Sequence, residues 1–255
     1  MRMRRGHRRQ LALFRRVALW FGATGVLWCA NGASAARRTA SWVHDTTVQP
    51  ERGVEIEQWI TDEIEGEDSR TGIWWAPVMG ITDNIELALP LEIVHEKSSD
   101  QTLFETYGMD LRWRLVTSDP VQVGPFVPLI RVGATRLIQD DAAKLDGSFV
   151  LSVDATKRLH LLAEAGAWMV TPGAVVEGSY GLAANYAVFE DLRLGAEGIA
   201  EQEIDNPDGT HEIWVAAGPT LSITHGRFWA TLGAPIGLTR AGPDALPRLA
   251  WGIAF

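Results

Sequence analysis

Side chains along most of this chain alternate between apolar and polar with a period of two residues. In residues 85–93 every odd position is Ile or Leu, and the even positions are Glu, Ala, Pro and Glu. Residues 107–115 repeat the pattern, with Gly, Asp and Arg between apolar neighbours. Because successive side chains of a strand point to opposite faces, each run predicts a β-strand with one apolar and one polar face. An all-β fold follows.

The same pattern recurs along the rest of the chain, and an even number of segments results. The twelve segments are 52–62, 71–81, 85–93, 107–115, 122–136, 149–155, 159–167, 176–186, 192–196, 213–223, 228–236 and 249–255. Segments 52–62, 71–81 and 122–136 are the weaker ones, so between ten and fourteen strands are compatible with the pattern.

The connections between the segments alternate in length. Short turns rich in Asp, Asn, Gly and Pro are expected at 81–84, 117–120, 156–158, 187–191 and 224–226. Longer polar links are expected at 62–70, 95–102, 137–147 and 202–210. Short turns on one side and longer loops on the other are typical of outer-membrane barrels. We therefore predict a transmembrane, antiparallel up-and-down β-barrel of about 12 strands.

A soluble barrel or sandwich also alternates, with its apolar face turned inward. Aromatic residues near the segment ends and the aromatic last residue favour the membrane barrel. The final residues, Trp251, Ile253 and Phe255 among them, resemble the C-terminal signal that is read by the bacterial barrel-assembly machinery.

The first 35 residues have the three parts of a cleavable signal peptide. Residues 1–16 hold seven arginines and no acid, 17–30 are uncharged, and Ala33-Ser34-Ala35 is a small-x-small cleavage pattern. Fourteen uncharged residues fall short of the roughly 20 that span a bilayer as a helix. We expect a signal peptide over 1–35, a periplasmic N-terminal leader over 36–51 and an outer-membrane barrel over 52–255.

Removing the signal peptide changes the charge of the chain. Seven of the 23 basic residues are lost, which leaves 16 against 32 acids, a net charge of −16 instead of −9. This acidic balance argues against a nucleic-acid partner. The single cysteine, Cys29, lies in the signal peptide, so the mature chain has no disulfide.

Ionisable side chains on the polar face are expected to line the lumen, because they are costly in lipid. The candidate pore-lining residues are Glu86, Glu92, Asp110, Arg112, Arg114, Arg131, Asp154, His160, Glu164, Glu177, Arg193, Glu197, Glu212 and Arg248. In a channel these charges form a constriction, and acidic loops such as 62–68 raise the local cation concentration. Alternatively, the charges pair across strands and plug a closed structural or adhesion barrel.

A hydrolase is a further alternative. Ser152, Asp154 and His160 fall in one hairpin, and His211 with Asp205 and Asp208 would form a second set at the rim. Neither set specifies a nucleophile and its base beyond composition, so no catalytic residue is predicted. The sequence contains no metal cluster, phosphate loop or dinucleotide motif, and neither a metal nor a cofactor is expected.

Six prolines fall inside predicted strands, where each removes a hydrogen bond of the sheet: Pro77, Pro90, Pro125, Pro128, Pro219 and Pro235. Bulges or local kinks are expected at some of them.

Residues 74–90 read WWAPVMGITDNIELALP. They resemble the repeated hairpin G-(I/L)-T-D-(N/R)-x-E-L of outer-membrane proteins in the meta-pathway phenol-degradation family and related transporter-like barrels. Weaker echoes occur at 156–161 and 189–195. The resemblance implies a barrel that helps small or aromatic compounds cross the outer membrane.

The sequence as a whole thus predicts a passive, weakly cation-preferring channel for small solutes, aromatic or cationic ones among them. Its expected partners are outer-membrane lipid and lipopolysaccharide, the barrel-assembly machinery and the solute.

Overall fold

The computed structural model describes residues 38–116, 126–172, 176–205 and 212–255. All of them belong to the unit Ser34–Phe255. The strands are β1 (Val54–Glu65), β2 (Asp68–Thr82), β3 (Ile85–Ala88), β4 (Leu91–Glu96), β5 (Gln101–Arg114), β6 (Phe126–Leu137), β7 (Ala142–Asp154), β8 (Leu159–Thr171), β9 (Val176–Ala187), β10 (Leu192–Asp205), β11 (Ile213–His225), β12 (Phe228–Gly233), β13 (Ile236–Gly237) and β14 (Arg248–Ala254). No helix among the described residues is long and apolar enough to cross a membrane.

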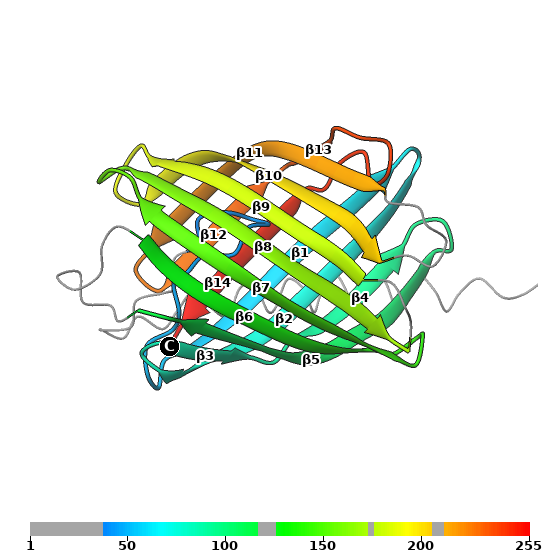
Figure 1. The fold of residues 1–255 in the computed structure, drawn as a ribbon, viewed down its shortest axis with the longest axis horizontal. Helices are drawn as coiled ribbons and strands as arrows, with labels where there is room; N and C mark the ends of the chain where they lie inside the picture. The colour runs from blue at the N-terminus through cyan, green and yellow to red at the C-terminus, as the bar shows by residue number, and fades with distance from the viewer. Residues whose placement is uncertain (1–37, 117–125, 173–175, 206–211) are drawn as a thin grey trace, which may run out of the picture. The chain divides into compact units, whose positions relative to one another are not determined.

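The strands form one closed antiparallel sheet (Figure 1). Apart from β3, β4, β12 and β13, each strand pairs with its neighbours in the sequence, and β1 closes the barrel against β14 from Glu55↔Ala254 to Thr61↔Arg248. Both β3 and β4 lie between β2 and β5, and β12 and β13 both pair with β11. Since each of these two pairs occupies one position in the wall, the fourteen strands make a barrel of twelve positions. The predicted fold and strand number are confirmed.

Two prolines explain why the wall contains fourteen strands instead of twelve. Pro90 separates β3 from β4, and Pro235 separates β12 from β13. At the first break, the carbonyl of Pro90 still accepts a hydrogen bond from the Gly108 amide, 2.9 Å away. Pro77, Pro128 and Pro219 lie within continuous strands. Pro125 lies outside the described residues.

The outer face of the wall is apolar. Large hydrophobic side chains there are exposed, Leu232 at 47% and Leu182 at 67% among them. The aromatic residues Tyr107, Trp113 and Phe149 are also about half exposed. An apolar surface of this extent suits contact with lipid. The even positions of β11 show the opposite face: Trp214, Ala216, Thr220 and Ser222 are buried.

One end of the barrel, the terminal end, carries short turns and Phe255. The described turns there fall at 83–84, 155–158, 188–191 and 226–227, as predicted. The predicted turn at 117–120 lies outside the described residues. The predicted long links at the opposite, loop end are shorter than expected, because strands continue into them. The link at 62–70 is a tight turn at Gly66 (φ 58°), and the one at 137–147 shortens to 138–141.

Candidate functional site

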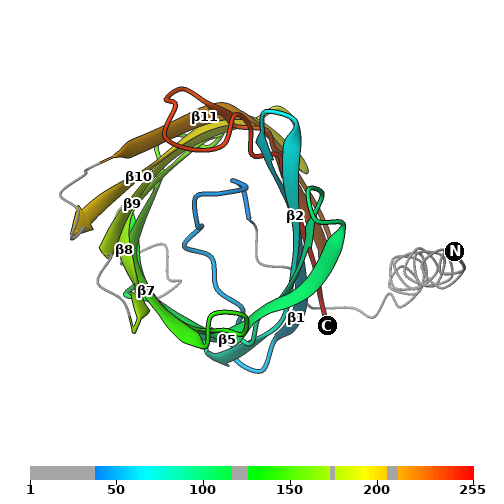
Figure 2. The same cartoon turned by 90° about the vertical axis from the view of Figure 1, so that its right-hand side faces the viewer.

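Residues 38–49, which we call the inner segment, lie inside the barrel and not in its wall (Figure 2). The segment leaves the wall at Pro50, whose carbonyl accepts a hydrogen bond from the Gly53 amide. The segment extends furthest from the terminal end near Trp42. Both of its ends lie near the terminal end, since Arg38 and Gln49 both bond to Glu86 there. The sequence assigned this stretch to a periplasmic leader and did not anticipate an interior position. Its serine and threonine residues show no periodic pattern that would indicate an interior position.

A buried charge cluster holds the inner segment at the terminal end. The Arg38 guanidinium contacts Glu86 at 2.8 Å and Glu57 at 3.8 Å. Arg112 approaches the same two carboxylates at 2.9 Å and 3.7 Å. All four side chains are at most 7% exposed. Ions taken this far from water must be paired to be tolerated, so Arg38 of the segment completes a charge balance that the wall alone lacks.

Two further contacts fix the return of the segment. The Gln49 side chain donates to Glu55 at 2.6 Å, and the backbone amide of Gln49 donates to Glu86 at 2.7 Å. Trp229 donates its indole N–H to the same Glu55 at 3.0 Å. Val48 packs on Leu129 and Val150, an apolar contact in a polar lumen.

The tip of the segment, residues 41–44, is bound by residues of three strands, β8, β10 and β14. The amides of Ser41 and Trp42 donate to one oxygen of Glu197 at 3.2 Å and 2.9 Å, and the Ser41 hydroxyl bonds to the other. Arg248 lies over the Trp42 ring, 3.3 Å from its centre, and donates to the Ser41 carbonyl. His44 pairs with Glu164 at 3.0 Å.

Asp45 ties the returning limb of the segment to β8. It accepts a hydrogen bond from Thr39 at 2.9 Å and lies 3.6 Å from the ring of His160. Burial tends to raise the pKa of Asp45, but the interactions with His160, Thr39 and Arg38 outweigh it and lower that pKa to about 2. The carboxylate is therefore ionised at neutral pH.

The Ser152, Asp154 and His160 set considered for a hydrolase does not assemble. His160 pairs with Asp154 at 2.8 Å and with Asp45. The hydroxyl of Ser152 instead forms a 2.5 Å hydrogen bond with Thr46. A serine needs its base within hydrogen-bond reach to act as a nucleophile, and here the inner segment occupies that place. Of the rim set, His211 and Asp208 lie outside the described residues.

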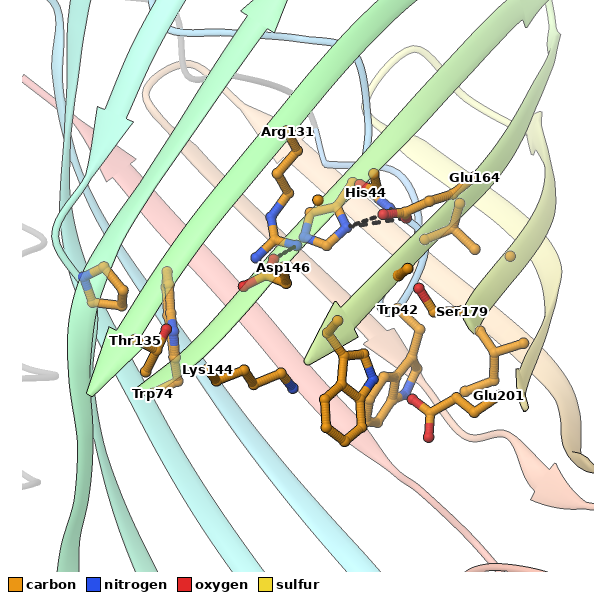
Figure 3. Close-up of a pocket in the computed structure, with 18 of the residues that line it drawn as sticks. Trp42, His44, Trp74, Arg131, Thr135, Lys144, Asp146, Glu164, Ser179 and Glu201 are labelled. Atoms are coloured by element: carbon orange, nitrogen blue, oxygen red, sulfur yellow. Dashed lines mark hydrogen bonds and ion pairs between the residues drawn. The ribbon is translucent and has the colours of Figure 1, made fainter. Parts of the chain in front are cut away.

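Beyond the tip, towards the loop end, the lumen widens into a cavity of about 450 Å³, which we call the vestibule (Figure 3). Trp42, Val43 and His44 form its floor. Its walls carry six carboxylates against three Lys or Arg side chains: Glu63, Glu92, Glu105, Asp146, Glu164 and Glu201 against Arg70, Arg131 and Lys144. A side pocket of about 280 Å³ shares Trp42, Glu63 and Glu201 with the vestibule.

The predicted pore-lining residues fall into four groups. Arg112, Glu86 and Asp110 are buried at the terminal half, where Asp110 also meets Arg131 at 2.5 Å. Others contact the inner segment: Glu164, Glu197, His160 and Arg248. Glu92 lines the vestibule, and Glu177 and Glu212 line the side pocket. Arg114, Asp154 and Arg193 lie towards the terminal end, where Arg114 bonds the turn residue Asn84.

Sequence reasoning missed several of the residues with which these side chains pair. Glu55 and Glu57 alternate with Val54 and Ile56, so the period-two signal that identified the other lumen charges was present. Asp146 lay in a predicted loop, whereas the structure places it in β7, 2.6 Å from Arg131.

Gly233 leaves room for the inner segment, and this makes it a test of the packing. A Cβ at Gly233 would lie 1.9 Å from the Ser41 hydroxyl and 2.5 Å from Glu197. We expect Gly233→Val to loosen the tip. In a Val43→Cys background, Gly233→Val should make maleimide labelling of the introduced thiol several-fold faster than it is without the Gly233 substitution. Gly198→Ala is the control, since no atom lies within 3.7 Å of its added Cβ. Equal labelling rates in all three proteins would contradict the described packing.

No family model and no curated protein matches this chain. Solved structures do. The COG4313 outer membrane channel from Pseudomonas putida F1 is 14% identical, with a TM-score of 0.57 over 83% of this chain and 98% of that chain. The KdgM porin is 8% identical (TM-score 0.54; 79% and 99% covered), and the NanC porin is 8% identical (TM-score 0.50; 79% and 98% covered). At these identities the similarity shows a shared fold, that of outer-membrane β-barrels.

Proposed function

We propose that this protein is a passive channel of the bacterial outer membrane that admits small solutes with a weak preference for cations. One observation carries the proposal: a closed twelve-position barrel encloses a vestibule whose carboxylates outnumber its basic residues six to three. A lumen lined by one sign of charge raises the local concentration of the opposite ion. The solved barrels of the same fold include one described as a channel and two described as porins.

The location rests on two features. The apolar outer wall requires a lipid environment, because a hydrophobic surface of this extent is unfavourable in water. The signal-peptide pattern of residues 1–35 supplies a route of export. In this proposal the signal is cleaved, the outer face meets lipid and lipopolysaccharide, and Trp251, Ile253 and Phe255 are read by the barrel-assembly machinery.

The solute class rests on a resemblance. The hairpin around residues 80–87 is similar to that of the meta-pathway phenol-degradation family, whose implied cargo is small or aromatic. The tryptophans of the vestibule, among them Trp42, Trp74 and Trp168, are compatible with aromatic cargo.

The test is a reversal potential. The mature chain in a planar bilayer under a KCl gradient should give a potential of cation-selective sign, because the carboxylates exclude chloride. Changing Glu63, Glu92 and Glu201 together to Gln should shift that potential towards zero or towards anion selectivity. Glu190→Gln, on an exposed turn, is the matched control and should leave the potential unchanged. A potential of anion-selective sign in the unaltered protein would refute the stated preference.

A closed structural barrel is the second candidate, and the inner segment is the observation that favours it. The segment lies in the lumen and is hydrogen-bonded to Glu86, Glu197 and Ser152 of the wall. If neither the mature chain nor a variant without the inner segment conducts, the channel proposal fails and the closed barrel remains.

A further inference from the structure

We propose that the vestibule and the side pocket together bind a compact organic cation with an alkylated ammonium group. The inference deepens the proposed channel function and rests on it for passage of the ligand, though not for binding. Three observations carry it: tryptophan faces that already hold cations, a lining in which carboxylates outnumber basic residues, and a cavity of suitable size.

The tryptophan rings of the site already attract cations of the protein itself. The Lys144 ammonium lies 4.2 Å from the centre of the Trp168 ring, and Arg248 lies 3.3 Å from that of Trp42. An aromatic face attracts a positive charge through its quadrupole, most strongly when the ring belongs to tryptophan. The side pocket adds Trp214, whose indole N–H is 3.3 Å from the Pro243 carbonyl and is thereby oriented. The surfaces of the cavity are thus suited to cations.

Carboxylates are in excess in the lining of the site. The lining of the side pocket contains five glutamates and, among the described residues, neither Lys nor Arg: Glu63, Glu177, Glu201, Glu203 and Glu212. Glu201 lines both cavities, close to Trp42 in Figure 3. Its carboxylate makes no direct hydrogen bond or ion pair within the described part of the chain, and the charges of Lys144 and Arg248 act on it only from a distance. A cationic ligand would therefore meet a carboxylate that no basic side chain of the described residues contacts directly.

The two cavities, of about 450 and 280 Å³, fall in or near the range of small-molecule sites. Tryptophan faces distinguish the class of cation. A small inorganic ion prefers oxygen ligands and its own water shell, whereas an alkylated ammonium is recognised by aromatic faces together with negative charge. Lys144 is then the internal competitor of the ligand, because its ammonium is a mobile charge on a flexible stem.

Binding is measured on the mature chain in detergent micelles by equilibrium dialysis of radiolabelled choline at low salt. The competitor is 3,3-dimethyl-1-butanol, the neutral isostere in which carbon replaces the ammonium nitrogen. We expect choline to bind at least ten-fold more tightly than the isostere. Glu201→Gln and Trp168→Leu should each weaken choline binding about five-fold. Lys144→Met should strengthen it, since this variant removes the competing ammonium.

Two matched variants separate the site from general effects. Trp113→Leu removes an exposed tryptophan of the outer wall, and Glu190→Gln removes a carboxylate at the terminal end. Both should bind choline like the parent. Trp168→Phe keeps an aromatic face, so its affinity for choline should lie between that of the parent and that expected for Trp168→Leu. This comparison holds even if the Leu variant folds poorly. Equal binding of choline and its isostere, or unchanged binding after both Glu201→Gln and Trp168→Phe, would overturn the inference.

The outcome is independent of conduction, because micelles sustain no gradient. Choline binding without conductance would refute the proposed channel and leave the site intact. Conductance without discrimination between choline and its isostere would refute the site and leave the channel intact.

Discussion

Deleting residues 38–49 is expected to raise the single-channel conductance of the barrel several-fold. The inner segment lies in the terminal half of the lumen and bonds to Glu86 there, and side chains such as Glu86 and Arg112 are almost completely buried. An eight-stranded barrel is already filled by its own side chains, and lumen width grows with strand number. Twelve wall positions with the segment removed therefore leave a water-filled path. The measurement is single-channel conductance in planar bilayers at fixed KCl.

The deletion should also increase cation selectivity. It removes Arg38 from the three carboxylates that surround it, Glu55, Glu57 and Glu86, and re-exposes them to water. Glu164 and Glu197 likewise lose their partners in the segment. Arg112 remains beside Glu57 and Glu86, while Arg131 and Arg248 still act on Glu164 and Glu197 from a distance. The wall should tolerate the change, because water that enters the lumen solvates the freed charges.

A second variant separates loss of the obstruction from damage to the wall. Glu197→Ala with Arg248→Ala leaves the chain length unchanged and removes the contacts that hold the tip at Ser41 and Trp42. It should show flickering between the parent conductance and the larger one. Gly198→Ala serves as the control again. A deletion variant that folds and conducts no more than the parent would show that the segment does not obstruct the pathway.

The wall was predictable from the sequence because a membrane barrel imposes one rule on every strand. A side chain that faces lipid must be apolar. The alternation of Leu111 and Trp113 with Asp110 and Arg112 is therefore visible in the sequence. The rule weakens beyond the lipid. Lys144 and Asp146 continue β7 where the outer face need not be apolar, and the sequence therefore indicated a loop.

The site was less predictable, because its contacts depend on register and on a segment without a period. Glu86 meets Arg112 since β3 and β5 pair them directly, while Arg112 also stands opposite Arg131. That like-charge pair is compensated by Asp110, which contacts both guanidinium groups. Such a network cannot be read from composition. The inner segment has neither alternation nor a helical repeat, and only its partners in the lumen reveal its position.

Replacing Glu86 by alanine is expected to cost about 3–5 kcal/mol of folding stability, the range for breaking a buried ion pair from one side. Glu86 accepts from Arg38, Arg112 and the Gln49 amide at 2.7–2.9 Å. Without it, both guanidinium groups keep Glu57 at 3.7–3.8 Å as their shared carboxylate, at a site closed to bulk water. The measurement is the midpoint of guanidinium-induced unfolding in lipid vesicles.

The same substitution in the deletion variant distinguishes this explanation from simple loss of packing. Without the inner segment, Arg38 is absent and Arg112 is solvated, so Glu86→Ala should cost well under half of its effect in the full chain. Glu190→Ala, on an exposed turn, should be neutral in both backgrounds. If Glu86→Ala costs the same with and without the segment, the carboxylate stabilises the wall alone. The inner segment would then be a passive occupant of the lumen, and the buried charges would give no reason for its position.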